Sequence, residues 1–187
     1  MVALAPVRPL SRVIDDDEVL VERVLRGDAP AFRELYGRHC RYVAGVVHRL
    51  MGDDADLDDI VQDTFVRAAE RLGTLRNRAQ VRPWLVTIAV RLAQSRMTRR
   101  RRRHWLRLQI TRAAATVSDP RDRAPADELA SALEQVPDKL RVPWLLARVE
   151  GLRLEEVAQS CGVSLATVKR RIADAQVRLD RRLGATA

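Results

Sequence analysis

The chain is poor in several features that whole classes of protein require. Only 4% of its 187 residues are aromatic, and only two are cysteines. Cys40 and Cys161 lie too far apart for a CxxC or Cys/His metal motif, which argues against a zinc site and favours two reduced thiols. No apolar run approaches the roughly eighteen residues that span a bilayer, and Pro6 and Pro9 interrupt the N-terminus where a signal peptide needs continuous apolar sequence. We therefore expect a soluble, cytoplasmic protein without metal or cofactor.

Catalytic motifs are also missing. No Ser/His/Asp triad, paired carboxylates or phosphate-binding loop can be recognised, and His39, His48 and His104 have no nucleophile or acid at a motif spacing. The acidic segment DDADLDDIVQD, residues 53–63, lacks the glycine and the terminal glutamate of an EF-hand loop. The sequence predicts a binding protein rather than an enzyme. A metal-dependent nuclease built on these aspartates is the alternative from the enzyme class.

What the chain does have is a strong separation of charge. Forty-eight residues from Arg71 to Ser118 include thirteen arginines and no acid, whereas the segment from Asp53 to Asp63 has six acids and no base. The net charge is +9, so the chain outside the arginine-rich segment is net −4. Arginine forms paired hydrogen bonds with phosphate and guanine, and a local positive field attracts polyanions. The basic segment predicts nucleic-acid binding, and the acidic segment predicts a protein partner that carries arginines.

The fold is predicted to be all-α, because apolar residues recur at intervals of three and four and never alternate with a period of two. Two small helical domains are expected, over residues 15–106 and 127–187, with a disordered tail over 1–14. The segment 107–126, rich in Ala, Ser and Pro, is expected to be a flexible linker. Helices are predicted near 16–26, 30–50, 57–72 and 81–103, and then near 127–135, 138–150, 153–160 and 164–183.

A helix-turn-helix is predicted between Leu154 and Ile172. Gly162 permits the tight turn between two helices, Val157 and Val168 supply shared core, and Ser164 is a natural N-cap for the second helix. The N-terminal half of such a helix enters the major groove of DNA. Its candidate contacts are Ser164, Thr167, Lys169, Arg170 and Arg171. A plain helical hairpin with a solvated, charged face is the alternative.

Two other helices carry candidate binding residues. Asp59, Gln62, Asp63 and Val66 form a polar ridge on the third helix that suits a basic partner, although carboxylates there also favour the helix N-terminus. Trp84 begins the arginine-rich fourth helix, and an aromatic ring beside guanidinium groups is typical of single-stranded DNA binding. Trp84 also continues an ordinary apolar stripe, so core packing is the alternative interpretation for it.

Taken in order, these segments resemble the extracytoplasmic-function (ECF) group of bacterial sigma factors, the two-domain specificity subunits of RNA polymerase. The resemblance covers most of the chain. Its first part rests on LVERVLRGDAPAFRELYGRH (20–39), DLDDIVQDTFVRA (56–68) and RPWLVTIAVRLAQSRMTRR (82–100). Its second part rests on LEQVPDKLR (133–141) and EGLRLEEVAQSCGVSLATVKRRI (150–172).

The resemblance implies an alternative sigma factor that performs no chemistry, binds core RNA polymerase through the β′ clamp helices and the β subunit, and directs it to promoter DNA. An anti-sigma factor is an expected further partner. The docking residues would be Asp56, Asp59, Gln62, Asp63, Phe65 and Arg67. Contacts to the minus-ten element, which the family melts, would come from Arg76, Asn77, Arg82, Trp84, Arg91, Arg96, Arg99 and Arg100. The helix-turn-helix residues would read the minus-thirty-five element.

The chain departs from the family pattern at a few positions. Arg91 and Ser95 stand where many members have Asn and Asp, and Asp174 occupies a recognition-helix position that is often basic. Pro143 lies in a helix that normally has no proline, and we expect it in the first turn, where proline is tolerated. The strongest rival is a free-standing helix-turn-helix regulator. Such a regulator would bind two half-sites as a dimer and would have no use for the acidic helix.

Overall fold

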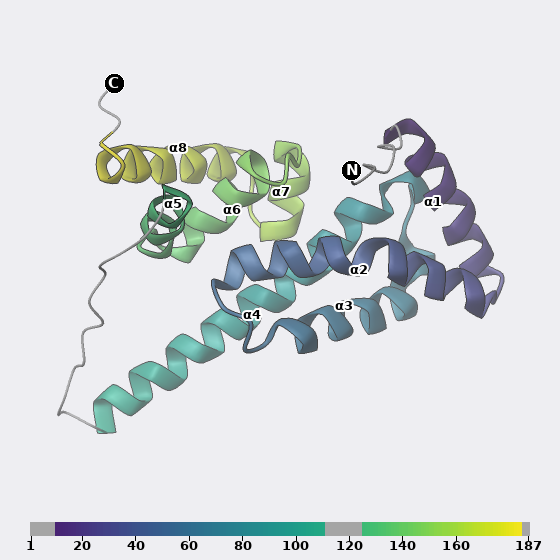
Figure 1. Cartoon of the computed structure of the whole chain (residues 1–187), viewed down its shortest axis with the longest axis horizontal. Helices are drawn as coiled ribbons and strands as arrows, with labels where there is room; N and C mark the ends of the chain where they lie inside the picture. The colour runs from purple at the N-terminus through teal and green to yellow at the C-terminus, as the bar shows by residue number, and fades with distance from the viewer. Residues whose placement is uncertain (1–9, 111–124, 185–187) are drawn as a thin grey trace, which may run out of the picture.

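All regular structure is helical in the computed structural model, which describes residues 10–110 and 125–184 (Figure 1). The first domain consists of α1 (Leu10–Leu25), α2 (Ala29–Met51), α3 (Leu57–Arg71), two short 3-10 turns (Leu72–Thr74 and Arg78–Gln80) and α4 (Val81–Ile110). The second domain consists of α5 (Pro125–Glu134), α6 (Asp138–Arg148), α7 (Leu154–Cys161) and α8 (Leu165–Arg182). The all-α prediction is confirmed.

Local sequence signals set the ends of α2. The Asp28 carboxylate accepts a hydrogen bond from the backbone N–H of Ala31 at 3.1 Å, and Pro30 lies in the first turn, where its missing N–H costs nothing. Gly52 ends the helix in the left-handed conformation with φ 75°, and its N–H donates to the carbonyl of His48. Both boundaries agree with the sequence prediction to within one residue.

Two helices are longer than predicted. α1 begins at Leu10 instead of 16, directly after Pro9, so residues 10–14 of the expected tail are helical. α4 continues to Ile110 because neither Gly nor Pro follows Pro83 to stop it. α5 begins at Pro125. Residues 1–9 and 111–124, the rest of the expected tail and linker, lie outside the described residues.

The expectation for Pro143 was wrong. α6 begins at Asp138, so the proline lies inside the helix and not in its first turn. Its ring nitrogen cannot donate to the carbonyl four residues earlier, which removes one helical hydrogen bond. The Pro143 side chain is buried with Trp144 and Leu146, so packing offsets the lost bond.

A single buried apolar cluster runs through both domains. In the first domain it includes Leu35, Ile60 and Leu85, all fully buried between α2, α3 and α4, and in the second it includes Leu146 and Val157. Burying such a side chain contributes about 1.5–3 kcal/mol, and truncating Leu85 to Ala would cost about 2–5 kcal/mol.

The two domains touch each other. α7 packs on α4, and α6 lies against α2, while the C-terminal part of α4 extends away from the rest of the molecule (Figure 1). No helix within the described ranges is both long and apolar enough to cross a membrane.

Candidate nucleic-acid and protein interfaces

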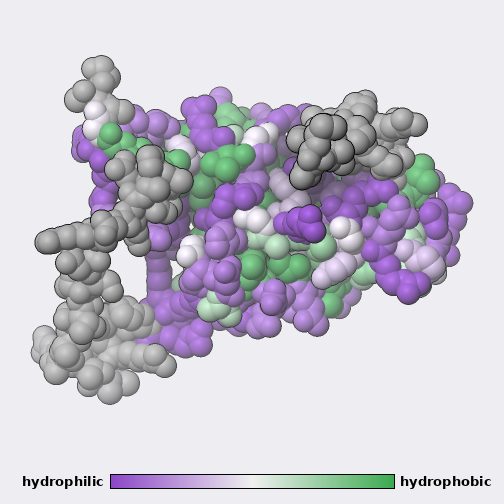
Figure 2. All heavy atoms as spheres, viewed as in Figure 1, coloured by the Kyte–Doolittle hydropathy of each residue, from purple (hydrophilic) through white to green (hydrophobic). Residues whose placement is uncertain are grey.

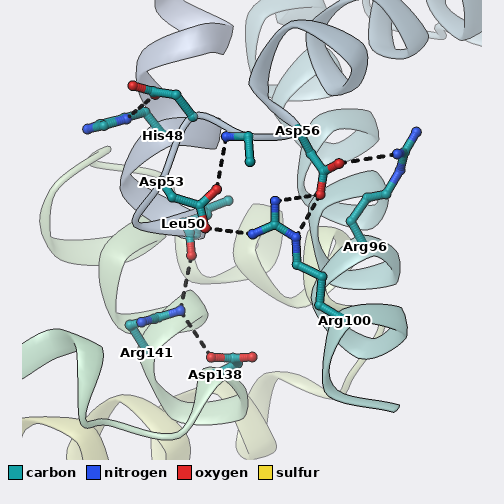
Figure 3. A network of polar contacts seen from close by, with 10 residues as sticks. His48, Leu50, Asp53, Asp56, Arg96, Arg100, Asp138 and Arg141 are labelled. Atoms are coloured by element: carbon teal, nitrogen blue, oxygen red, sulfur yellow. Dashed lines mark hydrogen bonds and ion pairs between the residues drawn. The ribbon is translucent and has the colours of Figure 1, made fainter. Parts of the chain in front are cut away.

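The acidic segment and the arginine-rich helix meet within the first domain (Figure 3). The Arg100 guanidinium donates from Nε to Asp56 Oδ2 at 2.7 Å and from a terminal nitrogen to Asp53 Oδ2 at 2.6 Å. One turn earlier on α4, Arg96 lies 3.5 Å from Asp56 and 3.5 Å from Asp63, with Asp59 at 3.8 Å. Two residues predicted to contact DNA therefore pair with three residues predicted to dock a protein.

These ion pairs shift the pKa values of Asp53 and Arg100. Hydrogen bonds from Arg100 lower the pKa of Asp53, and the N–H of Ala55 adds to this effect, while partial burial opposes it. The same hydrogen bond to Asp53 raises the pKa of Arg100. Asp59 and Asp63 keep 68% and 48% of their side chains exposed, so both carboxylates can still accept hydrogen bonds from another molecule. Asp56 is only 19% exposed and mainly joins α3 to α4.

Beside the acids, α2 and α3 form an apolar groove with a volume of about 600 Å³. Phe32, Tyr36, Phe65 and Val66 line it, together with Gln62 at its polar edge. The rings of Tyr36 and Phe65 meet edge to face, with centroids 4.7 Å apart. Figure 2 shows hydrophobic residues exposed among polar ones over α2 and α3.

The predicted docking residues thus differ in their exposure. Gln62 and Arg67 are exposed, whereas Phe65 is 3% exposed and forms the floor of the groove. Val66, 51% exposed, belongs to the predicted ridge, but Tyr36, 43% exposed, was not predicted at this surface. Tyr36 lies on α2, and no sequence spacing indicates that it faces the ridge on α3.

A second cavity, of about 420 Å³, lies where the loop before α4 meets the start of that helix. Arg76, Asn77 and Trp84 line it from the first domain, and Glu156 and Gln159 line it from α7. Trp84 is partly buried and packs against the core, as the core-packing interpretation expects, and it also lines this cavity. The Asn77 side chain also accepts from the N–H of Ala79 at 3.2 Å and shapes the loop.

The other basic residues predicted for minus-ten contacts have several environments. The Arg82 guanidinium stacks on the Tyr42 ring, 3.8 Å from its centroid. Arg91 donates to the backbone carbonyl of Gln159 at 3.0 Å. Arg99 is exposed. The structure therefore brings Arg76, Asn77 and Trp84 together at one cavity and gives Arg96 and Arg100 a different set of partners.

The helix-turn-helix is formed by α7 and α8 as predicted. Gly162 adopts φ 64°, the left-handed conformation that suits glycine, and its N–H closes the end of α7. Ser164 caps α8, because its hydroxyl accepts from the N–H of Thr167 at 3.3 Å. Val157 and Val168 are fully buried between the two helices.

Residues on the first half of α8 are available for binding. Lys169 and Arg170 are exposed, and Arg171 is partly exposed. Ser164 and Thr167 share a hydroxyl contact of 2.9 Å and hold the N-terminus of the helix. The N-terminal turn of a helix also attracts phosphate through its free N–H groups. All five predicted residues therefore lie on or beside one helix end.

Sequence reasoning missed the polar contacts between the domains. The hydroxyls of Thr87 and Ser160 lie 2.9 Å apart, and Arg49 pairs with Glu150 at 2.6 Å. Arg101 pairs with Asp138 at 2.8 Å, and Arg141 donates to the carbonyl of Leu50 at 3.1 Å. No motif or residue spacing predicts contacts between segments this far apart in the sequence.

Among the residues that the structure describes, no group of three or more His, Cys, Asp or Glu side chains is arranged to hold a metal ion. The carboxylates of the acidic cluster instead face Arg96 and Arg100; this cluster consists of Asp53, Asp56, Asp59 and Asp63.

Comparisons with known proteins agree with this arrangement. The sigma-70 region 2 family matches residues 35–103, and sigma-70 region 4 matches residues 126–179. The ECF RNA polymerase sigma-E factors of Salmonella typhimurium and Escherichia coli are each 30% identical over 180 residues, covering 89% of this chain and 94% of the relative. The RNA polymerase sigma-H factor of Pseudomonas aeruginosa is 28% identical over 182 residues, covering 90% of this chain and 94% of that protein.

Solved structures agree as well. CnrH in complex with the cytosolic domain of CnrY has a TM-score of 0.64 at 26% identity, covering 91% of this chain and 99% of that chain. The sigma factor RpoE of Bartonella quintana, solved with the anti-sigma factor NepR, has a TM-score of 0.65 at 21% identity, covering 83% and 98%, and supports the fold. Two sigma regions in the right order and relatives aligned over nearly their full length place this chain in the ECF family of RNA polymerase sigma factors, as an alternative sigma factor that directs the polymerase to promoters.

Proposed function

We propose that the two domains of this sigma factor divide its binding tasks during initiation. The first domain docks on core RNA polymerase and captures the minus-ten element. The second domain holds the minus-thirty-five element as duplex DNA. The chain itself makes or breaks no covalent bond, and it works in the cytoplasm by contributing binding free energy.

Docking is assigned to the face formed by the acidic cluster and the adjacent groove of α2 and α3. The support is the combination of half-exposed Asp59 and Asp63 with the apolar walls at Tyr36 and Val66. A basic, amphipathic surface such as a pair of clamp helices complements both features. Gln62 and Arg67 add exposed polar contacts, and Phe65 supports the groove from below.

Capture of the minus-ten element is assigned to the cavity beside Trp84. A base that leaves the duplex stack needs a pocket with an aromatic or apolar wall and polar groups that recognise its edge. Trp84 supplies the wall, Asn77 supplies an amide, and Arg76 supplies a cation for the backbone. The exposed guanidinium of Arg99 and those of Arg82 and Arg91 extend the positive surface along the strand. Binding to the opened strand offsets the cost of melting a few base pairs.

Reading of the minus-thirty-five element is assigned to the first half of α8. Lys169 and Arg170 point away from the domain core, and Arg171 lies beside them. Arginine can bind a guanine edge with two hydrogen bonds, while Ser164 and Thr167 suit phosphate contacts at the helix N-terminus. An anti-sigma factor is proposed as the regulator, because the Bartonella quintana factor, which shares this fold, was solved with the anti-sigma factor NepR.

The single observation that carries the proposal is the cavity lined by Arg76, Asn77 and Trp84 on the same domain as the acidic docking face. The test is transcription in vitro with sigma-free core polymerase on fragmented genomic DNA of the source organism, followed by sequencing of RNA 5′ ends. We expect a small set of start sites that share two upstream elements. Trp84→Ala should reduce those transcripts at least tenfold, and the exposed Thr98→Ala on the same helix should not. Start sites that do not depend on the added protein would refute the proposed function.

A further inference from the structure

We propose that Glu22 and Arg78 are positioning residues for the cavity beside Trp84, because their ion pair ties the loop 72–80 to α1 and holds this loop in shape before DNA arrives. The inference rests on the proposed function, since it takes the cavity as the site for a base of the minus-ten element. Neither Glu22 nor Arg78 lines the cavity, so both act through the loop residues that do.

The loop 72–80 presents neighbouring side chains to different surroundings. Arg76 and Asn77 are exposed and line the cavity. Arg78, the next residue, is not part of that lining and donates from a terminal nitrogen to the Glu22 carboxylate on α1. The residues that can touch a base and the residue that anchors the loop are therefore adjacent in the chain. A movement of Arg78 necessarily displaces Arg76 and Asn77.

Apolar packing fixes the ends of the loop more firmly than its middle. Leu72 and Val81 are almost fully buried, whereas Arg76 and Asn77 between them are exposed. The Asn77 side chain accepts from the N–H of Ala79 at 3.2 Å, which sets the local shape of the loop but not its place on the domain. The ion pair with α1 supplies that link to a different helix.

Glu22 is itself held on a fixed helix. One carboxylate oxygen accepts from Arg78, and the other accepts from Arg26, one turn further along α1, at 3.1 Å. α1 is anchored by Leu20 and Val21, which are buried in the core, and it packs against both 3-10 turns of the loop (Figure 1). Hydrogen bonds between charged groups are directional as well as attractive. The carboxylate therefore determines where the Arg78 side chain lies.

The exposure of the pair suits positioning better than stability. The side chains of Glu22 and Arg78 are 36% and 40% exposed, and ion pairs at such exposure contribute little to the free energy of unfolding. Such a tether still restricts an exposed loop, and a restricted loop loses less conformational entropy when a ligand binds. Removal of the pair should therefore weaken base capture about threefold and leave the unfolding midpoint unchanged.

The experiment is a double-mutant cycle measured by DNA binding of the holoenzyme. Core polymerase carries the wild-type protein, Glu22→Gln, Arg78→Gln or the double variant. The DNA is a fluorescent duplex with the minus-ten sequence found by start-site mapping, left unpaired so that melting does not contribute. Each single variant should bind about threefold more weakly, and the double variant no more weakly than either, because both changes remove the same tether. Arg26→Gln removes the other partner of Glu22 and should bind like the wild type.

Base discrimination is a readout that a purely structural role would not change. Each position of the unpaired element is replaced in turn, and the affinity ratio between the preferred base and the others is measured. The ratio should fall at the captured base in Glu22→Gln and in Arg78→Gln, and it should keep its wild-type value in Arg26→Gln. Urea unfolding should give the same midpoint for all of these proteins.

Amide hydrogen exchange tests the tether without DNA. Peptides that cover the loop 72–80 in the free protein should exchange several-fold faster in Glu22→Gln than in the wild type. Peptides from the buried part of α2 should exchange at the same rate in both proteins. Arg26→Gln should leave the exchange of the loop unchanged.

The outcomes separate positioning from direct contact with DNA. If Arg78 were a DNA-binding cation that Glu22 masks, Glu22→Gln would strengthen binding while Arg78→Gln would weaken it. Effects of opposite sign, or losses that add in the double variant, would overturn the positioning role. Wild-type binding and discrimination by both single variants would overturn it as well.

Failure of the proposed function would look different. A wild-type holoenzyme without base preference in the unpaired strand, or a Trp84→Ala protein with full preference, would overturn the assignment of the cavity to the minus-ten element. Hydrogen exchange would still report whether the pair of Glu22 and Arg78 holds the loop.

Discussion

The Arg100 guanidinium donates to the Asp56 carboxylate at 2.7 Å and thereby joins the arginine-rich helix to the acidic one. The acidic segment and the arginine-rich segment of this sequence therefore form ion pairs with each other within the folded chain. Asp56 is the more buried end of this contact, while Asp59 and Asp63 lie further out with most or half of their surface exposed. The arginines of α4 fix the inner carboxylate and leave the outer ones more exposed to solvent.

Removing Arg100 should destabilise the first domain. Arg100→Ala deletes hydrogen bonds to Asp53 and Asp56 and leaves carboxylates close together without their cation. We expect a loss of about 1–2 kcal/mol in the free energy of unfolding, measured by urea denaturation. Arg102→Ala, an exposed arginine on the same helix, should change it by less than about 0.5 kcal/mol. Equal losses for both variants would show that the contacts of Arg100 contribute nothing specific.

The Asp53 contact should make stability depend on acid pH. The pKa of Asp53 is lowered in the folded protein, chiefly by its hydrogen bond from Arg100, so its contribution is fully present above the ordinary value of 3.8. That contribution is lost as the pH falls from about 4 through the lowered pKa. The difference in unfolding free energy between wild type and Asp53→Asn should therefore be present at pH 5 and vanish towards pH 2. A difference that stays constant over this range would contradict the assignment.

The Cys161 thiol should be unusually slow to react. Burial raises its pKa to about 11 from 9.0, and Arg171 opposes the shift only in part. Because only the thiolate is nucleophilic, a shift of this size predicts alkylation near pH 8 about a hundredfold slower than for an ordinary cysteine. Rates should be measured for the Cys40→Ser protein between pH 7 and pH 10. A rate equal to that of a free thiol would show that Cys161 is not buried in solution.

Arg170 should contribute to sequence discrimination. Arg170→Ala is expected to cost about 1–3 kcal/mol in binding to the preferred minus-thirty-five duplex and much less on unrelated DNA. Arg178→Ala changes the same charge on the exposed far half of α8 and should weaken both duplexes slightly and equally. Fluorescence anisotropy of the holoenzyme on labelled duplexes separates these outcomes. An equal loss on both duplexes for Arg170→Ala would assign this residue to phosphate contacts alone.

The sequence was most informative where a local signal determines the structure. Gly162 ends α7 and Ser164 begins α8 as predicted, because a left-handed glycine and a capping hydroxyl act within one turn of chain. The helix-turn-helix followed from the same short-range rules. The start of α1 and the end of α4 were predicted less well. No Gly or Pro follows Pro83 within α4, so nothing in its sequence stops the helix near Arg103.

Contacts between distant segments were predicted poorly for a different physical reason. Arg96 and Arg100 are one turn apart on a single face of α4, which could have indicated a partner on a neighbouring helix, but their chemistry equally suits phosphate. Thr87 and Ser160 carried no signal, because single hydroxyls on apolar faces have no pattern. Such pairs depend on how two domains pack, which short-range rules do not determine.

The central claim, that the exposed acids of α3 dock this sigma factor on core RNA polymerase, is tested most directly by equilibrium binding of the labelled protein to sigma-free core enzyme. Asp63→Arg is compared with Asp174→Arg, the same charge reversal on the exposed face of α8, with circular dichroism as a check that both fold. The account predicts at least tenfold weaker binding for Asp63→Arg and unchanged binding for Asp174→Arg. Wild-type affinity for the Asp63→Arg protein would contradict it.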